Sequence, residues 1–399
     1  MSGRRAVGAA CAAICRKNDP GRACPGLSAV ADIHAPDQPF RPAGLINRIV
    51  ASARFQSFCA RVPGLRGIAR REGAALFDLM QGFVQSQMLM ALVELRALQM
   101  LADGPATADT LATRCDVPPE RMQVLLQAGA AMRLLKRRGE RFALARRGAA
   151  FLAVPGLQDM VRHHDVLYRD LADPVAFIRC ETVPELAEFW PYVFGAKGAM
   201  DPAQTERYSR LMAESQALVA QEALAHLSLK GTHKLMDVGG GTGVFLRAVR
   251  ARYPQIELVL FDLPDVVAQA ALPADIARHG GSFRSDPLPQ GADTISLVRV
   301  LYDHSDQTVR ALLAKVFAAL PPGGRVLIIE PMSGGLRPNP QTDVYFSVYT
   351  LAMQTGQTRS AARISALLSE AGFEEISREH ADRPYITCVL TASKPKGGG

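Results

Sequence analysis

The chain has 399 residues and a mass of 43.0 kDa, which is enough for two or three domains that each bury a core. Hydrophobic residues make up 48% and charged residues 21%, values typical of globular proteins, and no uninterrupted apolar run reaches the roughly 18 residues of a membrane-spanning helix. The seven cysteines are scattered without a C-x-x-C pair. This pattern argues against a disulfide framework or a metal site and predicts reduced thiols in the cytoplasm.

The net charge of +8 is concentrated near the N-terminus. Residues 1–71 hold twelve Lys and Arg but only three Asp and Glu, so the other 328 residues are nearly neutral. Residues 1–40 contain prolines and glycines without periodicity, which predicts a disordered basic leader. We expect the basic arm from Arg41 to Arg71 to contact the inner or an intracytoplasmic membrane peripherally. A solvated or organellar leader and a nucleic-acid contact are the alternatives.

Residues 41–155 are predicted to form a helical dimerisation domain. Apolar residues recur at helical spacing from Leu76 to Leu101, which predicts one or two long helices that are partly interrupted by Gly82. Two short helices and a strand follow, at residues 108–114, 118–132 and 141–144. This order is typical of a winged helix-turn-helix. The second short helix is mainly apolar, so we expect it to make contacts within a homodimer and expect no nucleic-acid partner. DNA binding is the alternative.

Residues 156–229 are predicted to be a helical connector that contributes to a substrate pocket. His164 and Tyr168 share one predicted helix, and Met212 lies on the helix that leads into the next domain. These three residues are the candidate pocket residues. His163 and His164 are adjacent and point to different faces of their helix, so they are not expected to bind a metal together.

Residues 230–399 alternate short apolar runs with helical patterns, which predicts an open, doubly wound α/β sheet. Strands are expected at 234–238, 257–262, 294–301 and 325–329, and another strand, third in chain order, is expected to end at the loop 280–283. Helices are expected at 307–320 and 361–371. An antiparallel pair of strands at 374–379 and 385–392 is expected to close the edge of the sheet. Acidic and aromatic residues follow successive strands. They stand where such a sheet binds its ligand.

The first of these strands leads into a glycine loop. The loop contains Gly239, Gly241 and Gly243. Counted from Gly241, the third glycine of a dinucleotide fingerprint would fall at Leu246, so the loop does not suit a pyrophosphate. Asp237 precedes the loop, where it suits a cationic amino acid, and Asp262 ends the next strand about 20 residues beyond the glycines. The pattern favours S-adenosylmethionine (SAM) over a dinucleotide.

Residues 77–394 resemble the class I SAM-dependent O-methyltransferases that include the plant phenylpropanoid and hydroxyindole enzymes. The resemblance rests on the segments 237–243 and 262–266. It implies a Rossmann-like, seven-stranded methyltransferase sheet behind a winged-helix dimerisation domain, with residues 230–399 binding SAM. It also implies that Asp237, Gly239, Gly241, Gly243, Asp262, Leu263 and Arg299 contact the cofactor, that Ser282 and Phe283 flank its adenine, and that Glu330 stands beside the reacting oxygen.

Two departures from the family pattern bear on the substrate. The family has His-Asp-Trp after the fourth strand, with the histidine as general base, whereas this chain has Tyr302-Asp303-His304; Thr358 replaces the second catalytic glutamate. These changes resemble the bacterial carotenoid branch, which methylates a tertiary hydroxyl of hydroxyneurosporene or demethylspheroidene. We therefore expect a hydrophobic carotenoid substrate. A phenolic or polyketide substrate and a DNA-binding regulator are the alternatives.

The expected chemistry is an in-line displacement in which the protein aligns the substrate hydroxyl with the methyl donor. We expect Tyr302 to orient this hydroxyl, His304 or Glu330 to accept its proton, and Asp303 to position His304. The alternative is that alignment alone drives the reaction and His304 is a structural residue.

Overall fold

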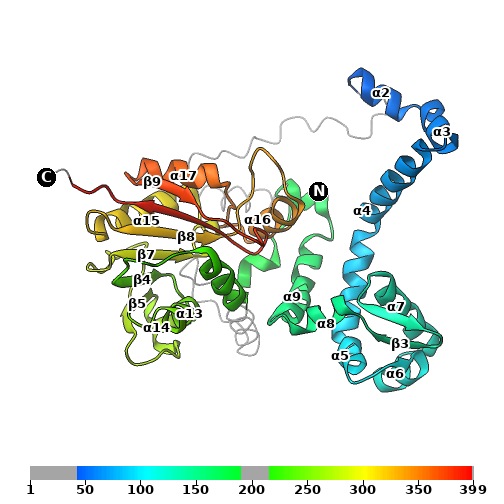
Figure 1. The fold of residues 1–399 in the computed structure, drawn as a ribbon, viewed down its shortest axis with the longest axis horizontal. Helices are drawn as coiled ribbons and strands as arrows, with labels where there is room; N and C mark the ends of the chain where they lie inside the picture. Colours follow the sequence, from blue (N-terminus) through cyan, green and yellow to red (C-terminus); the bar gives the residue numbers. More distant parts are fainter. Residues whose placement is uncertain (1–42, 190–214, 398–399) are drawn as a thin grey trace, which may run out of the picture. The chain divides into compact units, whose positions relative to one another are not determined.

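The computed structural model describes residues 43–189 and 215–397, which form two compact units divided between Val154 and Pro155 (Figure 1). The first unit comprises residues 43–154, and the second comprises residues 155–189 and 215–397. The predicted leader and Met212 lie outside the described residues.

The first unit begins with four helices. They are α2 (Leu45–Ala51), α3 (Ala53–Arg61), α4 (Leu65–Glu94) and α5 (Ala97–Ala102). The predicted interruption at Gly82 is wrong, because α4 is a single helix of 30 residues that includes Gly82. A glycine inside a helix costs only about 1 kcal/mol, too little to end a helix of this length. The break lies instead before α5, where Arg96 adopts a left-handed conformation with φ of 53°.

The rest of the first unit combines short helices with a small sheet. Its elements are β1 (Ala106–Thr107), α6 (Ala108–Cys115), α7 (Pro119–Ala131), β2 (Leu135–Arg138), β3 (Arg141–Leu144) and α8 (Arg146–Ala153). The predicted helix, helix and strand are all present, and the basic segment before Gly139 forms β2, which pairs with β3. Leu92, Leu111, Met122 and Phe142 are fully buried in a core shared by α4, α6, α7 and β3.

The second unit is built on a seven-stranded sheet, as predicted (Figure 1). Its strands are β4 (Lys234–Val238), β5 (Glu257–Asp262), β6 (Ala277–Gly280), β7 (Thr294–Val298), β8 (Arg325–Glu330), β9 (Glu374–Arg378) and β10 (Cys388–Ser393). The strand order is β6-β5-β4-β7-β8-β10-β9, with β10 antiparallel to both of its neighbours. β7 ends three residues earlier than predicted, because Arg299 adopts φ of 56° and the chain then forms a 3-10 turn, η2 (Leu301–Asp303).

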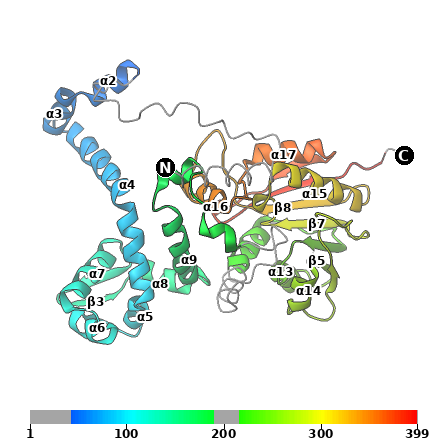
Figure 2. The same cartoon turned by 180° about the vertical axis from the view of Figure 1, so that it is seen from behind.

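Helices cover both faces of this sheet (Figure 2). They are α13 (Val244–Arg252), α14 (Pro264–Gln269), α15 (Asp306–Ala319), α17 (Ala361–Glu370) and a helix at 215–226. Met236 packs with α15 and α17, whereas the preceding Leu235 packs with α13 and the helix at 215–226. Alternate side chains of each central strand thus enter different cores, as a parallel sheet covered on both faces requires.

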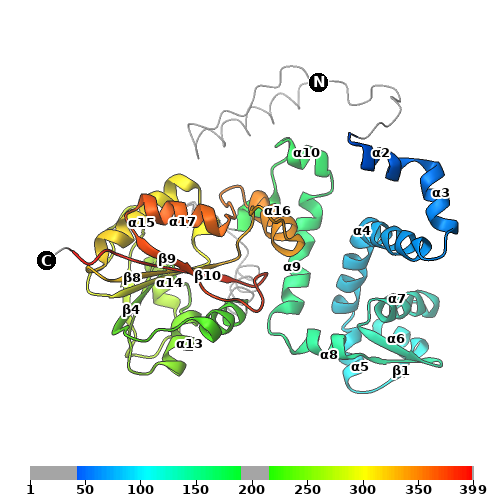
Figure 3. The ribbon, with the colours of Figure 1, turned by 45° about the horizontal axis from the view of Figure 1, so that its top comes forward.

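A helical layer stands beside the sheet (Figure 3). It consists of α9 (Leu157–Asp170), α10 (Pro174–Ile178), η1 (Glu185–Phe189), the π-helix η3 (Pro340–Phe346) and α16 (Ser347–Ala352). Val166, Phe177, Leu186 and Tyr349 pack together in its core. In the part of the chain that the structure describes, no helix is both long and apolar enough to cross a membrane.

Candidate active site

Asp237, near the end of β4, is a buried carboxyl with one unused oxygen. Its side chain is 0% exposed, and the Ser296 hydroxyl donates to Oδ1 at 2.6 Å, while Oδ2 has no hydrogen-bond partner. Burial, together with the nearby carboxyl of Asp262, raises the pKa of Asp237 to about 7. An unpaired buried carboxyl is costly, so this oxygen is suited to a cationic ligand such as an ammonium group.

The glycine loop after β4 keeps space open beside Asp237. Gly239, Gly241 and Gly243 have φ of 70°, 57° and 73°, a left-handed conformation that side chains disfavour. A Cβ at Gly240 would lie 2.6 Å from Asp237 Oδ2. Any other residue at this position would therefore fill the space that the unpaired oxygen faces.

Asp262, at the tip of β5, is a second acid beside the loop. Its Oδ2 accepts from the backbone N–H of Gly241 and its Oδ1 from that of Leu263, both at 2.7 Å. Burial raises its pKa. β4 and β5 are adjacent parallel strands, so their two acids flank one loop. A carboxyl for an ammonium group and another for a sugar diol fit SAM, and the residues present therefore suit this cofactor.

The loop after β6 carries the predicted adenine residues. The backbone N–H of Ser282 donates to Asp286 Oδ2 at 2.8 Å, and Lys315 Nζ donates to the Phe283 carbonyl at 2.7 Å. The Phe283 ring packs edge-on against the His304 ring at a centroid distance of 5.3 Å. Ser282 and Phe283 are thus held in an anchored loop, and His304 belongs to its surroundings.

His304 lies in a setting that differs from the predicted one. Its Nδ1 is 3.3 Å from Arg284 Nη2, whereas Asp303 Oδ1 has no hydrogen-bond partner, so the expected pairing of Asp303 with His304 is wrong. Burial, Arg284 and Arg359 lower the pKa of His304 to about 3. An imidazole of such low basicity is a poor proton acceptor near neutral pH.

The turn η2 brings Tyr302 and Asp303 together with Glu330. Glu330, at the end of β8, accepts from the Tyr302 backbone N–H through Oε2 at 3.2 Å, and its Oε1 is buried without a partner. Burial raises the pKa of Glu330 to about 7 and that of Asp303 well above its usual value. Glu330 raises the pKa of Asp303 further, and both carboxyls add to the raised pKa of Tyr302. One unpaired carboxyl oxygen thus lies on η2, and a second belongs to the strand residue that binds this turn.

Arg299 connects this turn to the helix at 215–226. Its Nε donates to the Tyr302 hydroxyl at 3.1 Å, and its Nη1 donates to Ser215 Oγ at 3.0 Å. Burial raises the pKa of Tyr302, so its phenol stays neutral. The structure places Arg299 against Tyr302, and its predicted contact with the cofactor stays a prediction.

Arg359 is a site residue that the sequence did not single out. It is 2% exposed and donates to the carbonyls of Leu301 and His304, at 2.8 and 2.7 Å, and to Asp306 Oδ1 at 2.7 Å. It therefore holds both ends of η2. The neighbouring Thr358, which replaces the family's glutamate, instead joins a hydroxyl cluster with Ser333 and Ser347.

Two tyrosines that were not predicted line the helical layer. Tyr345 OH and Tyr349 OH lie 2.8 Å from Nε2 of His164 and His163, respectively, and the two rings stack with centroids 6.0 Å apart. Both histidines thus meet one neighbouring segment. Tyr168 is half-buried on the same helix and electrostatically affects Tyr345. The predicted pocket residues His164 and Tyr168 therefore adjoin an aromatic cluster.

Comparison with known proteins covers both units. The O-methyltransferase domain family matches residues 168–374, and the O-methyltransferase dimerisation domain family matches residues 77–153. A demethylspheroidene O-methyltransferase from Cereibacter sphaeroides is 60% identical over 87% of this chain and 94% of its own length. A protein of the same name from Rhodobacter capsulatus is 52% identical over 90% of this chain and 92% of its own length. The structure of human N-acetylserotonin methyltransferase in complex with SAM matches with a TM-score of 0.68 and 25% sequence identity. The match covers 81% of this chain and 98% of the human one.

Proposed function

Because this chain belongs to the family of SAM-dependent O-methyltransferases with a dimerisation domain, we propose that it methylates the tertiary hydroxyl of an acyclic hydroxycarotenoid. The observation that carries the proposal is the 60% identity, over nearly the whole relative, to a demethylspheroidene O-methyltransferase. The predicted cofactor, SAM, agrees with family membership.

Asp237, the glycine loop and Asp262 are the residues that would hold the cofactor. SAM supplies an electrophilic methyl group on a sulfonium centre. In our proposal Asp237 Oδ2 binds the ammonium group, Asp262 accepts hydrogen bonds from the ribose hydroxyls, and Ser282 and Phe283 border the adenine. Three buried acids at or near the carboxyl ends of β4, β5 and β8 also favour a ligand with positive charge.

Glu330 and Asp303 take the place of the family's histidine base in this proposal. Each has a buried oxygen without a partner, and the pKa of Glu330 near 7 suits a group that accepts a proton at neutral pH. Tyr302 accepts a hydrogen bond from Arg299, which leaves its own hydrogen free to orient the substrate oxygen. His304 becomes a residue of the adenine wall, because its pKa is too low for a base.

A substrate panel tests this assignment. Purified protein is incubated with SAM and either a 1-hydroxy acyclic carotenoid or a set of catechols and hydroxyindoles, and products are detected by mass. We expect a gain of one methyl group on the carotenoid alone. Methylation of the phenols alone would transfer the assignment to the phenolic alternative, whose acetylserotonin relatives reach 31% identity.

We also propose that α4 is covered by a second copy of the chain. Its exposed apolar side chains include Leu76, Phe77, Leu79, Met80 and Phe83, which are 56–81% exposed. The dimerisation domain match begins at residue 77, within this stretch. Exposed apolar area of this kind is typical of an oligomer interface.

A segment before this stretch is suited to an anionic membrane surface. Residues 43–71 contain six arginines and no Asp or Glu, and Leu45, Ile46, Val50 and Phe58 are 52–75% exposed. The segment lies outside the dimerisation match. Arginines near anionic headgroups contribute on the order of 1 kcal/mol each, and the apolar side chains add insertion. A polyene substrate dissolves in the bilayer, so we propose that this segment brings the enzyme to it.

Vesicle pelleting tests the membrane contact with the full chain. The double variant Arg54→Gln, Arg61→Gln should pellet less with phosphatidylglycerol vesicles, while the matched variant Arg133→Gln, Arg138→Gln should pellet like the unaltered chain. All four arginines are exposed, so both variants lose the same charge. Equal pelleting of the two variants would refute the assignment, and dimer dissociation in the first would assign the segment to the second copy instead.

A further inference from the structure

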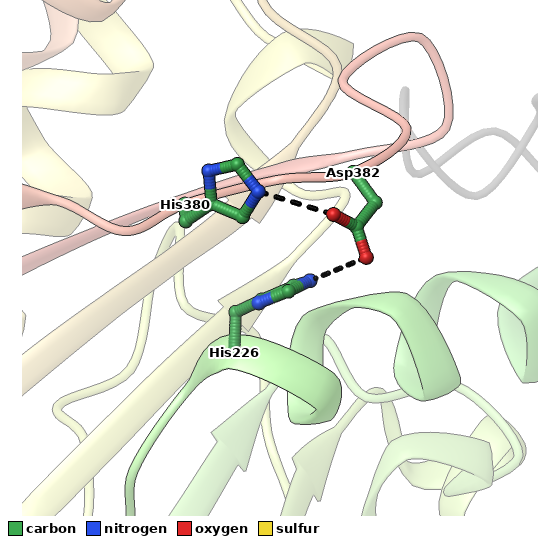
Figure 4. A group of neighbouring side chains, drawn as sticks. All are labelled: His226, His380 and Asp382. Atoms are coloured by element: carbon green, nitrogen blue, oxygen red, sulfur yellow. Dashed lines mark hydrogen bonds and ion pairs between the residues drawn. The ribbon is translucent and has the colours of Figure 1, made fainter.

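Three side chains that can bind metal converge at the surface of the second unit, outside the site described above. His226 ends the helix at 215–226, while His380 and Asp382 lie in the loop between β9 and β10 (Figure 4). His226 Nε2 is 3.0 Å from Asp382 Oδ2, and His380 Nε2 is 3.1 Å from Asp382 Oδ1. The ligand atoms of the three side chains all lie within 4.8 Å of one another.

We infer that His226, His380 and Asp382 bind one divalent transition-metal ion, with Zn²⁺ as the best match. Imidazole nitrogens and a carboxylate oxygen are zinc ligands, and a tetrahedral ion with bonds of about 2.0–2.1 Å separates its ligand atoms by roughly 3.3 Å. The two observed N···O distances, which run to different oxygens of the Asp382 carboxylate, are each close to this edge length. Water completes the coordination as the fourth ligand.

Binding requires the hydrogen on each ring Nε2 to leave. In the hydrogen-bonded arrangement, each ring donates to the carboxylate through an Nε2–H group. When the ion binds, each ring carries its hydrogen on Nδ1 instead, so the Nε2 lone pair faces the metal. The ion takes the place of the two hydrogens between the rings and the carboxylate, and small side-chain rotations bring the ligand atoms, now within 4.8 Å of one another, to the tetrahedral spacing.

A neighbouring ion pair holds the loop against the helix. Glu222 lies one turn before His226 and is 4% exposed; it accepts from the backbone N–H and from Nε of Arg383, at 2.8 and 2.7 Å. The rings of His226 and His380 also pack edge-on, with centroids 4.9 Å apart. The ligands are therefore gathered before the ion arrives, which reduces the entropy lost on binding.

The helix that carries His226 reaches the active site at its other end. Ser215, at the start of its described part, accepts a hydrogen bond from Arg299, which also holds Tyr302. An ion bound at His226 would tie this helix to the β9–β10 loop. Because a ligand that binds only the folded state stabilises it, Zn²⁺ should raise the melting temperature of the protein.

Calorimetric titration with Zn²⁺ tests the inference on tag-free, chelator-treated full chain. We expect uptake of one equivalent, with affinity lowered at least about tenfold in His226→Ala, His380→Ala and Asp382→Asn, since even residues that merely support a ligand change affinity by 10–100-fold. The matched control is His279→Ala, which removes another exposed histidine and should bind as the unaltered chain does.

Melting temperature gives a second readout that is independent of methyl transfer. His380 is 73% exposed, so His380→Ala should fold normally and melt like the unaltered chain without zinc. Zinc should then stabilise the unaltered chain and His279→Ala but not His380→Ala. Failure of the unaltered chain to bind zinc, or binding by the three ligand variants as tight as that of the unaltered chain, would overturn the inference. Neither result would affect the proposed methyltransferase activity.

Discussion

Replacement of Arg359 by methionine should destabilise the second unit strongly. Arg359 is buried and donates to the carbonyls of Leu301 and His304, which would be left without these hydrogen bonds. An unsatisfied buried polar group costs about 1–3 kcal/mol, and loss of one partner of a buried ion pair costs about 3–5 kcal/mol. We therefore expect the free energy of unfolding to fall by about 3–5 kcal/mol.

The matched control for this variant is Arg363→Met. Both arginines pair with Asp306, at 2.7 and 2.6 Å, but the Arg363 side chain is 38% exposed, and surface ion pairs contribute about 0–1 kcal/mol. For a unit of this size, 1 kcal/mol corresponds to about 2–4 °C, so the Arg359 variant should melt roughly 6–20 °C lower and the control less than about 4 °C lower. Scanning calorimetry measures both. Equal losses in the two variants would show that Arg359 does not hold η2 as described.

Two further predictions concern protons at the active site. SAM affinity should fall by up to tenfold per pH unit below pH 7, because the ammonium group binds the ionised form of Asp237, whose pKa is about 7. Asp237→Asn should bind more weakly and without this slope. Calorimetry that finds the same slope in Asp237→Asn would contradict the assignment. Glu330→Gln should lower kcat at least about a hundredfold and leave the affinity for SAM nearly unchanged, because Glu330 is the proposed base. His304→Gln should retain the kcat of the unaltered chain. A larger loss of rate in His304→Gln than in Glu330→Gln, measured in single-turnover assays, would restore His304 as the base.

The strands around the cofactor loop could be predicted from sequence because their ends carry local signals. β4 is a short apolar run that ends at Val238, after Asp237 and before a glycine loop, and β5 is one that ends at Asp262 before a proline turn. Both have the predicted bounds. β7 gives no such signal. Its apolar run continues from Val298 through Val300 to Leu301, and only the left-handed backbone of Arg299 ends the strand.

The contacts that the sequence did not reveal join residues far apart in the chain. Arg359 meets Leu301 across 58 residues, and Tyr349 meets His163 across 186. The three proposed zinc ligands include His226 and Asp382, which are separated by 156 residues without a recognisable spacing. His304 was expected to act as a base on the strength of its residue type, but Arg284 and burial decide its proton affinity. Such effects depend on tertiary packing, which residue patterns do not encode.

The most direct test is whether the protein transfers a methyl group to a hydroxycarotenoid, and whether this transfer requires the carboxyl group of Asp262. The full chain and its Asp262→Ala variant are mixed with SAM and a 1-hydroxy acyclic carotenoid, and the carotenoid is recovered and weighed by mass spectrometry. We predict a product heavier by one methyl group, with its tertiary oxygen etherified, from the unaltered chain and almost none from the variant. An unmodified carotenoid in both reactions, or undiminished product from Asp262→Ala, would contradict it.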